Sequence, residues 1–186
     1  VLDRLEQLRR TGSWSDCAGR GTMAWGDARL NLKGLPDSCK PDIVLLDAFS
    51  PSRCPQLWSE EFLAGLADRL APGGRLLTYC RAAAVRSSLR RAGLELRSLL
   101  PAPRQRIEWS SGTLAAKESG KGRLAAEGPG WTALSFMEEE HLQTRASVPY
   151  RDPEGDGDAD RIRRRRELEQ ESCDLESTSA WQRRWR

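Results

Sequence analysis

A run of apolar residues that ends in an acid constrains the fold of this chain more than any other feature. The run is PDIVLLD, residues 41–47, and it lacks the polar alternation of a strand with one face in water. Continuous apolar strands are typical of sheets whose two faces are both covered by other elements. We therefore expect an α/β fold in which both faces of this strand are buried.

The following segments extend the same pattern. Residues 57–70 place apolar side chains at helical spacing and stop at the Ala-Pro-Gly-Gly turn of residues 71–74. Residues 75–80 predict a second strand, residues 82–93 a second helix that ends at a glycine, and residues 94–100 a third strand. Strands that alternate with helices through short connections predict a mostly parallel sheet with right-handed crossovers.

The chain before this core is expected to hold a helix, a short strand and then a second, brief helix. Residues 1–10 place leucines on one helical side, residues 11–21 are loop-like, and residues 22–26 predict a strand that reaches a Gly-Asp turn. The chain starts within the expected helix and with valine, so we expect that an N-terminal portion is missing.

Composition divides the chain into three expected parts. Residues 1–116 are predicted to form a partial α/β domain, and residues 117–150 a loop and edge segment with one antiparallel strand in WTALSF. Residues 151–186 hold ten acids and nine arginines and are predicted to be a charged, partly helical extension. The stretch DRIRRRRELEQE within the extension predicts an exposed charged helix.

The bulk composition excludes several classes of protein. Five scattered cysteines without a C-x-x-C pair fit a reducing compartment, so we expect a cytoplasmic protein. His141 is the only histidine, and we expect no metal site. No apolar run approaches the ~20 residues that span a bilayer, and we expect no membrane partner. A dinucleotide fingerprint is missing, which argues against a nicotinamide oxidoreductase on a similar sheet.

One segment is unusually basic. Seven arginines and a single acid, Glu95, lie between Arg81 and Arg106. Such a segment can face an anion, or it can be the solvated face of a helix and a loop, and the pattern favours neither reading.

Two acids follow predicted strands. Ligands of open α/β sheets bind beyond the carboxyl ends of the strands, so we expect Asp27 and Asp47 to face one crevice. A turn-forming or helix-capping role is the alternative for Asp27. Asp47 ends a strongly apolar strand, where burial of an acid is costly unless the acid has a charge partner or a functional role.

The segment that starts at Asp47 resembles the MnmC-like family of tRNA methyltransferases, which modify the wobble uridine. The family pattern is D-[AG]-F-[SA]-P, then P-x-[LM]-W, a helix, P-G-G-x-L-x-T and V-R-x-x-L-x-x-A-G. This chain has DAFSP at residues 47–51, PQLW at 55–58, PGGRLLT at 72–78 and VRSSLRRAG at 85–93. The C-terminal stretch looks like that of cyanobacterial members of the MnmD type.

The resemblance implies a class I methyltransferase with a Rossmann-like sheet that is incomplete at its N-terminus. It implies that S-adenosyl-L-methionine donates a methyl group to the exocyclic amine of 5-aminomethyl-2-thiouridine in tRNA. The adenine of the donor would then meet Asp27 and the Ala28 amide, and Asp47 would lie between the donor and the target amine. Asp47, Phe49 and Pro51 would be the catalytic residues.

The same resemblance implies how tRNA is bound. Phe49 and Trp58 are candidates for apolar walls around a splayed-out base, although core packing is the favoured role of Trp58. The phosphates would meet five arginines, namely Arg81, Arg86, Arg90, Arg104 and Arg106. A separate enzyme that supplies the aminomethyl intermediate is an implied partner.

Methyl transfer to an amine is an in-line displacement that depends mainly on positioning. An ordinary aspartate and a lysine-like amine differ by about 6 pKa units, which corresponds to about 8 kcal/mol for complete proton transfer. Our hypothesis is that Asp47 orients the amine through a hydrogen bond while water removes the proton.

Two features of the family are missing from this sequence. They are the Gly-rich turn after a first strand and the acid that holds the ribose hydroxyls, and both belong upstream of residue 1. A chain without them is expected to bind S-adenosyl-L-methionine weakly, so the alternative function is a non-catalytic RNA-binding remnant that keeps the arginines. Some relatives carry a fused FAD-dependent oxidase domain, for which this chain is too short, so we expect no flavin.

Overall fold

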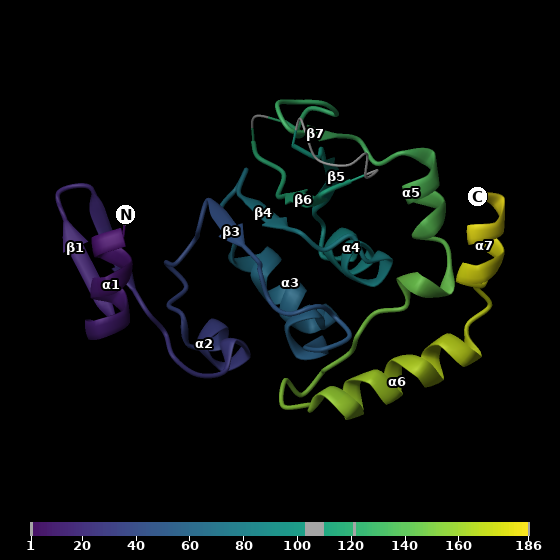
Figure 1. Cartoon of the computed structure of the whole chain (residues 1–186), viewed down its shortest axis with the longest axis horizontal. Coiled ribbons are helices and arrows are strands. Elements are labelled where there is room, and N and C mark those ends of the chain that lie inside the picture. The colour runs from purple at the N-terminus through teal and green to yellow at the C-terminus, as the bar shows by residue number, and fades with distance from the viewer. Residues whose placement is uncertain (1, 103–109, 121, 186) are drawn as a thin grey trace. The chain divides into compact units, whose positions relative to one another are not determined.

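The computed structural model describes residues 2–102, 110–120 and 122–185, which form two compact units divided after Leu35 (Figure 1). The second unit contains the predicted alternation of strands and helices. The first unit agrees with the prediction in its helices and differs from it in its strands.

The first unit consists of a helix, a β-hairpin and a second short helix. These elements are α1 (Leu2–Thr11), β1 (Ser13–Asp16), β2 (Gly19–Thr22) and α2 (Ala28–Gly34). The predicted N-terminal helix and the brief helix after Asp27 are confirmed, but the loop expected at residues 11–21 is an antiparallel hairpin, and no strand follows at residues 23–26. Trp14 pairs with Gly21, and a Cβ on Gly21 would lie 2.2 Å from the Trp14 indole nitrogen. This glycine therefore allows a local pairing that apolar periodicity cannot reveal.

A five-stranded sheet in the order β3-β4-β6-β5-β7 is the centre of the second unit. Its strands are β3 (Ile43–Leu45), β4 (Arg75–Thr78), β5 (Glu95–Leu99), β6 (Gly112–Ala116) and β7 (Trp131–Thr132). β3 and β4 pair in parallel, and β6 pairs antiparallel with both β4 and β5. The three predicted strands β3, β4 and β5 thus point the same way, but β6, which we did not predict, lies between two of them. β7 pairs antiparallel with β5, as predicted for an edge strand.

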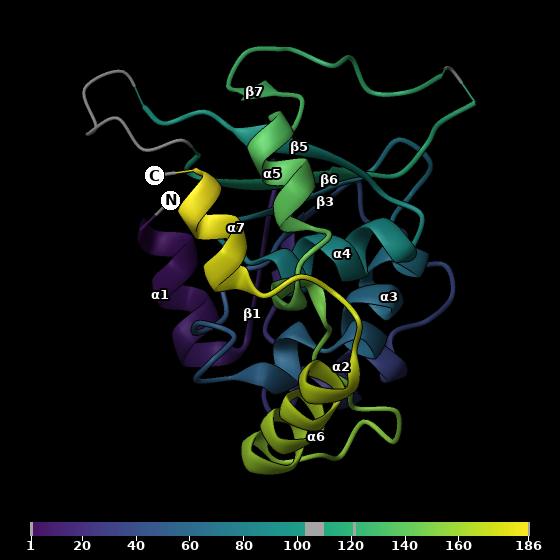
Figure 2. The same cartoon turned by 90° about the vertical axis from the view of Figure 1, so that its right-hand side faces the viewer.

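Two helices connect the strands that point the same way, namely α3 (Glu60–Arg69) and α4 (Ala83–Arg91). Both crossovers step across the sheet in the same direction, so right-handed connections place both helices on one face, as Figures 1 and 2 show. The hydrophobic core lies between this face and the helices, where Leu63, Leu76 and Leu89 have no exposed surface.

β3 is an edge strand of the described sheet, and only one of its faces is buried. Val44 packs against the core, whereas Ile43 is 62% and Leu45 75% exposed. The prediction that both faces of this strand are covered is therefore wrong within the described structure. The reason is that α3 and α4 cover only the face that Val44 shares with Leu76.

The remaining helices also belong to the second unit. They are η1 (Pro55–Trp58), α5 (Phe136–His141), η2 (Arg145–Ser147), α6 (Ala159–Ser172) and α7 (Thr178–Arg184). α6 confirms the predicted charged helix, with the nearly fully buried Ile162 as its anchor. The boundaries at residues 116 and 150 stay predictions. Among the described helices, none combines the length and the apolar composition that crossing a membrane requires.

Candidate active site

Asp47 directly follows β3, at the carboxyl end of the strand, as the sequence predicts. Its side chain is exposed, and it forms no ion pair with any residue that the structure describes. The carboxylate is thus available to a ligand at the edge of the sheet where α/β proteins bind their substrates.

The backbone after Asp47 is held by side chains from neighbouring elements. The hydroxyl of Tyr79 donates to the carbonyl of Ala48 at 2.7 Å, and the indole nitrogen of Trp58 donates to the carbonyl of Phe49 at 2.6 Å. Trp58 has no exposed surface and packs edge-on to the Tyr79 ring at a centroid distance of 6.1 Å. Core packing of Trp58 is therefore confirmed, and its polar edge also fixes the position of the loop.

Phe49 and Pro51 lie in the same loop with different exposure. Phe49 is 74% exposed, and the Arg53 guanidinium lies 5.9 Å from its ring centroid. Pro51 is half-buried in a turn where the amides of Arg53 and Cys54 donate to the carbonyl of Ser50 at 2.8 and 2.9 Å. The exposed ring beside an arginine offers a surface on which a nucleic-acid base can stack.

Tyr79 follows β4 and therefore lies at the same edge of the sheet as Asp47. Partial burial raises the pKa of the Tyr79 phenol, and the Cys80 thiol and the Asp47 carboxylate act in the same direction. The phenol thus keeps its proton at neutral pH and can donate to Ala48. We did not predict a role for Tyr79, although its position directly after the strand RLLT was a usable signal.

Asp27 belongs to the first unit, where it caps α2. Its carboxylate accepts the Arg29 amide at 2.9 Å and the Arg29 guanidinium at 2.7 Å. The hydrogen bonds from Arg29 hold the pKa of Asp27 below its ordinary value. The capping role is therefore present in the structure. Contacts of Asp27 and Ala28 with adenine stay predictions, and so does a crevice shared with Asp47.

Arg86 is not available to nucleic acid. It is 1% exposed, and it donates to Glu138 Oε1 at 2.7 Å and to Thr113 Oγ1 at 2.8 Å. The prediction that Arg86 contacts phosphates is therefore wrong, because its guanidinium is the charge partner of a buried acid. Arg104 and Arg106 lie outside the described residues.

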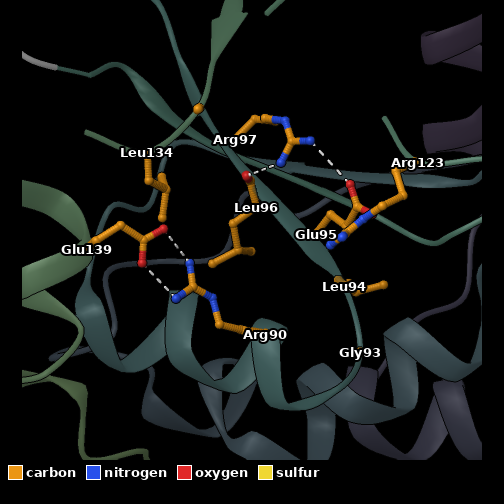
Figure 3. Close-up of a pocket in the computed structure, with 10 residues that line it drawn as sticks. Arg90, Gly93, Leu94, Glu95, Leu96, Arg97, Arg123, Leu134 and Glu139 are labelled. Atoms are coloured by element: carbon orange, nitrogen blue, oxygen red, sulfur yellow. Dashed lines mark hydrogen bonds and ion pairs between the residues drawn. The ribbon is translucent and has the colours of Figure 1, made fainter. Parts of the chain in front are cut away.

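The other two predicted arginines lie at opposite edges of the sheet. Arg81 follows β4 and shares the edge of Asp47. Arg90 lies near the end of α4, which returns to the edge where β5 begins, and it pairs with Glu139 at 2.8 Å (Figure 3). The predicted arginines thus do not form one surface, and among the described ones only Arg81 lies at the edge of the candidate site.

A cavity of about 460 Å³ opens beside Arg90, at the edge opposite to Asp47. Figure 3 shows that its charged side chains pair with one another: Arg90 with Glu139, and Arg97 with Glu95 at 3.2 Å. Because β5 begins at this cavity and runs in the same direction as β3, the cavity is not part of the candidate active site.

A group of carboxylates precedes α6. Oxygens of Asp152, Glu154 and Asp156 lie within 4.8 Å of one another. Arg161 pairs with Asp156 and lies 4.0 Å from the other two acids, and the Gly157 amide donates to Asp152 at 2.8 Å. The negative charge of this loop is thus compensated by the chain itself.

The fold and the exposed acid at the end of β3 can be compared with those of known protein families. Residues 16–114, just over half of the chain, match the family described as S-adenosyl-L-methionine-dependent methyltransferase, and the chain belongs to that family. The predicted methyltransferase fold and the predicted methyl donor are thereby confirmed.

Particular relatives narrow the comparison. The chain is 41% identical over 91 residues to the tRNA 5-methylaminomethyl-2-thiouridine biosynthesis bifunctional protein MnmC of Caulobacter sp. (strain K31). This alignment covers 48% of this chain and 15% of the relative. It is 45% identical over 82 residues to the protein of the same name from Ralstonia nicotianae. That alignment covers 43% of this chain and 12% of the relative. Among solved structures, MNMC2 from Aquifex aeolicus superimposes with a TM-score of 0.75 and 26% identity, over 91% of this chain and 51% of that chain. The chain thus spans less than a sixth of the length of these curated relatives.

Proposed function

We propose that this chain transfers a methyl group from S-adenosyl-L-methionine to the amine of 5-aminomethyl-2-thiouridine at the wobble position of tRNA. The exposed Asp47 at the carboxyl end of β3 is the observation that carries the proposal. Similarity to proteins named for 5-methylaminomethyl-2-thiouridine biosynthesis supports this choice of substrate.

The residues present are compatible with the methyl donor, which supplies an electrophilic methyl group when it is bound. Asp47 is exposed and forms no ion pair with the described residues, so it has free acceptor sites. Asp27 already accepts from Arg29, but a carboxylate has about four lone-pair sites, so its capping role leaves room for an adenine amino group. Asp27 and Ala28, which belong to the first unit, remain the proposed contacts of the adenine.

Asp47 is proposed to orient the amine and not to keep its proton. The pKa values of an ordinary carboxylate and an alkyl amine differ by about 6 units, so the acid is a poor final acceptor. The exposure of Asp47 gives water access to the same nitrogen. Phe49, also exposed, provides a ring against which the uracil base can stack.

Two arginines at the carboxyl edge of the sheet are the proposed tRNA contacts. Arg53 follows β3, as Asp47 and Phe49 do, and Arg81 follows the parallel strand β4 at the same edge of the sheet. Both arginines would approach the phosphates. A separate enzyme would supply the aminomethyl group, and the reaction would take place in the cytoplasm.

The test compares Asp47→Asn with Asp42→Asn, which removes an exposed charge at the other end of the same strand. The assay follows transfer of a labelled methyl group to tRNA that carries 5-aminomethyl-2-thiouridine. Asp47→Asn should lower kcat by at least about 100-fold, within the range expected when a reacting group loses its orientation. Asp42→Asn should keep the kcat of the unsubstituted protein.

Two results would contradict the proposal. Near-normal turnover by Asp47→Asn would remove this carboxylate from the reaction. Absence of measurable S-adenosylhomocysteine binding in a calorimetric titration, together with salt-sensitive tRNA binding, would favour the non-catalytic RNA-binding alternative.

A further inference from the structure

Three backbone carbonyls of the loop after β3 accept hydrogen bonds from side chains outside the loop. Tyr79 and Trp58 bind the first two, as described above. The third is the carbonyl of Ser52, which accepts a hydrogen bond from Nη1 of Arg163 at 2.8 Å. Arg163 lies on α6, more than one hundred residues further along the chain, in the extension whose role the sequence leaves open.

The position of α6 is fixed by buried contacts. Ile162, directly before Arg163, is 1% exposed and belongs to the hydrophobic core. Arg166 donates to the carbonyls of Val148 and Ala146 at 2.7 and 3.0 Å. These contacts hold the helix from which Arg163 reaches the loop.

The strand-like segment before α6 is bound to the element that follows the loop. The Glu60 amide donates to the Tyr150 carbonyl at 2.8 Å, and the Asp152 amide donates to the Glu61 carboxylate at 2.7 Å. Glu60 and Glu61 belong to the first turn of α3, which follows the loop and η1. The extension and the loop are therefore both connected to the start of α3.

We propose that Arg163 is a positioning residue that holds the loop of residues 47–54 in its reactive geometry. The proposal rests on the proposed function, since it concerns the reaction at Asp47. An in-line displacement is sensitive to misplacement of the reacting groups by as little as about 1 Å. Asp160 forms an ion pair with the same guanidinium, which favours a role within the protein over a phosphate contact.

The test compares three substitutions on α6. Arg163→Ala removes the donor, Arg163→Lys keeps a cationic donor, and Arg164→Ala is the matched control, because Arg164 is the exposed neighbour on the same helix. Hydrogen–deuterium exchange of peptides that contain the Arg53 and Cys54 amides measures the loop itself, and methyl transfer to tRNA gives kcat and KM.

Arg163→Ala should speed exchange of the loop about fivefold, the factor expected for one hydrogen bond of typical net strength. Its kcat should fall about tenfold with KM for tRNA unchanged, because the loop and not the RNA contact is altered. Arg163→Lys should recover part of both effects, and Arg164→Ala should match the unsubstituted protein.

Unchanged exchange in Arg163→Ala would overturn the proposal, and so would faster exchange with an unchanged kcat. A raised KM for tRNA at constant kcat would identify a phosphate contact and would also overturn it. If the unsubstituted protein has no methyltransferase activity, the proposed function fails, and the exchange experiment alone then decides whether Arg163 holds the loop.

Discussion

Arg86 and Glu138 form a buried ion pair that offers a quantitative test of how the second unit is stabilised. Their side chains are 2% and 3% exposed, and their charged atoms lie 2.7 Å apart. Burial alone raises the pKa of Glu138, but hydrogen bonds from the Ser135 amide, the Ser98 hydroxyl and Arg86 outweigh it and hold the pKa below its ordinary value. Glu138 is therefore charged at neutral pH and needs its partner.

The loss of unfolding free energy expected for Arg86→Met is limited, because the other buried polar groups around Arg86 keep hydrogen-bond partners. Thr113 still donates its hydroxyl to the carbonyl of Cys80 at 2.7 Å, and the Gly112 carbonyl still accepts from Ser110 at 2.8 Å. Glu138 is then the group that loses its charge partner. Removing one member of a buried pair costs about 3–5 kcal/mol, and we expect about 3–4 kcal/mol here, a large part of the 5–15 kcal/mol typical of a whole domain.

Urea unfolding, followed through the fluorescence of the buried tryptophans, measures this change. Glu138→Leu should cost about 1 kcal/mol more than Arg86→Met, since it also removes the capping box with Ser135. The double variant Arg86→Met/Glu138→Leu should be more stable than Glu138→Leu alone, because no unpaired charge stays buried.

Two outcomes would refute this reasoning. One is a loss below about 1 kcal/mol in Arg86→Met, the size of an ordinary hydrogen bond. The other is strict additivity in the double variant. Folded Arg86→Met should also keep the tRNA affinity of the unsubstituted protein, and a selective loss of affinity would return Arg86 to the RNA-binding residues.

Two further predictions concern pH and backbone packing. Burial lowers the pKa of His141, whose ring stacks on Trp181 at a centroid distance of 4.2 Å. The unfolded chain therefore binds the proton more readily, so stability should fall as pH drops below the ordinary histidine value of about 6.5 and towards the lower folded pKa. Unfolding midpoints between pH 7.5 and about 5 should show this slope, and His141→Gln should reduce it; equal slopes would contradict the assignment. A Cβ on Gly112 would lie 2.3 Å from the Thr78 carbonyl, so Gly112→Ala should destabilise by about 1–3 kcal/mol in thermal unfolding. Gly120→Ala meets no atom within 4 Å and is the control, and equal midpoints for the two variants would refute the packing argument.

The parts of the fold that follow from local periodicity were predicted well. Helical and strand spacing located α3, α4, β4 and β5 in their order, and the apolar run before Asp47 placed that acid at the carboxyl end of a strand. Each of these features depends on residues that are near one another in the sequence, so it leaves a local pattern.

The features that were missed depend on distant residues. The segment GTLAA of β6 has no polar alternation because it is buried on both sides, and its pairing with β4 and β5 cannot be read from its own residues. Arg86 has the composition of a solvated helix face, and only the approach of Glu138 from α5 makes its burial possible. Arg163 has no local sign that it reaches Ser52.

The place of β6 in the sheet has a consequence for the order in which the chain is assembled during translation. β4 and β5 leave the ribosome before the strand that joins them, so each has an unpaired edge until Ala116 has emerged. Open strand edges are templates for association with other chains. Nascent chains whose emerged part ends between Leu99 and Gly112 should therefore depend most on chaperones, and the same interval is a poor place to end a truncated variant intended for expression.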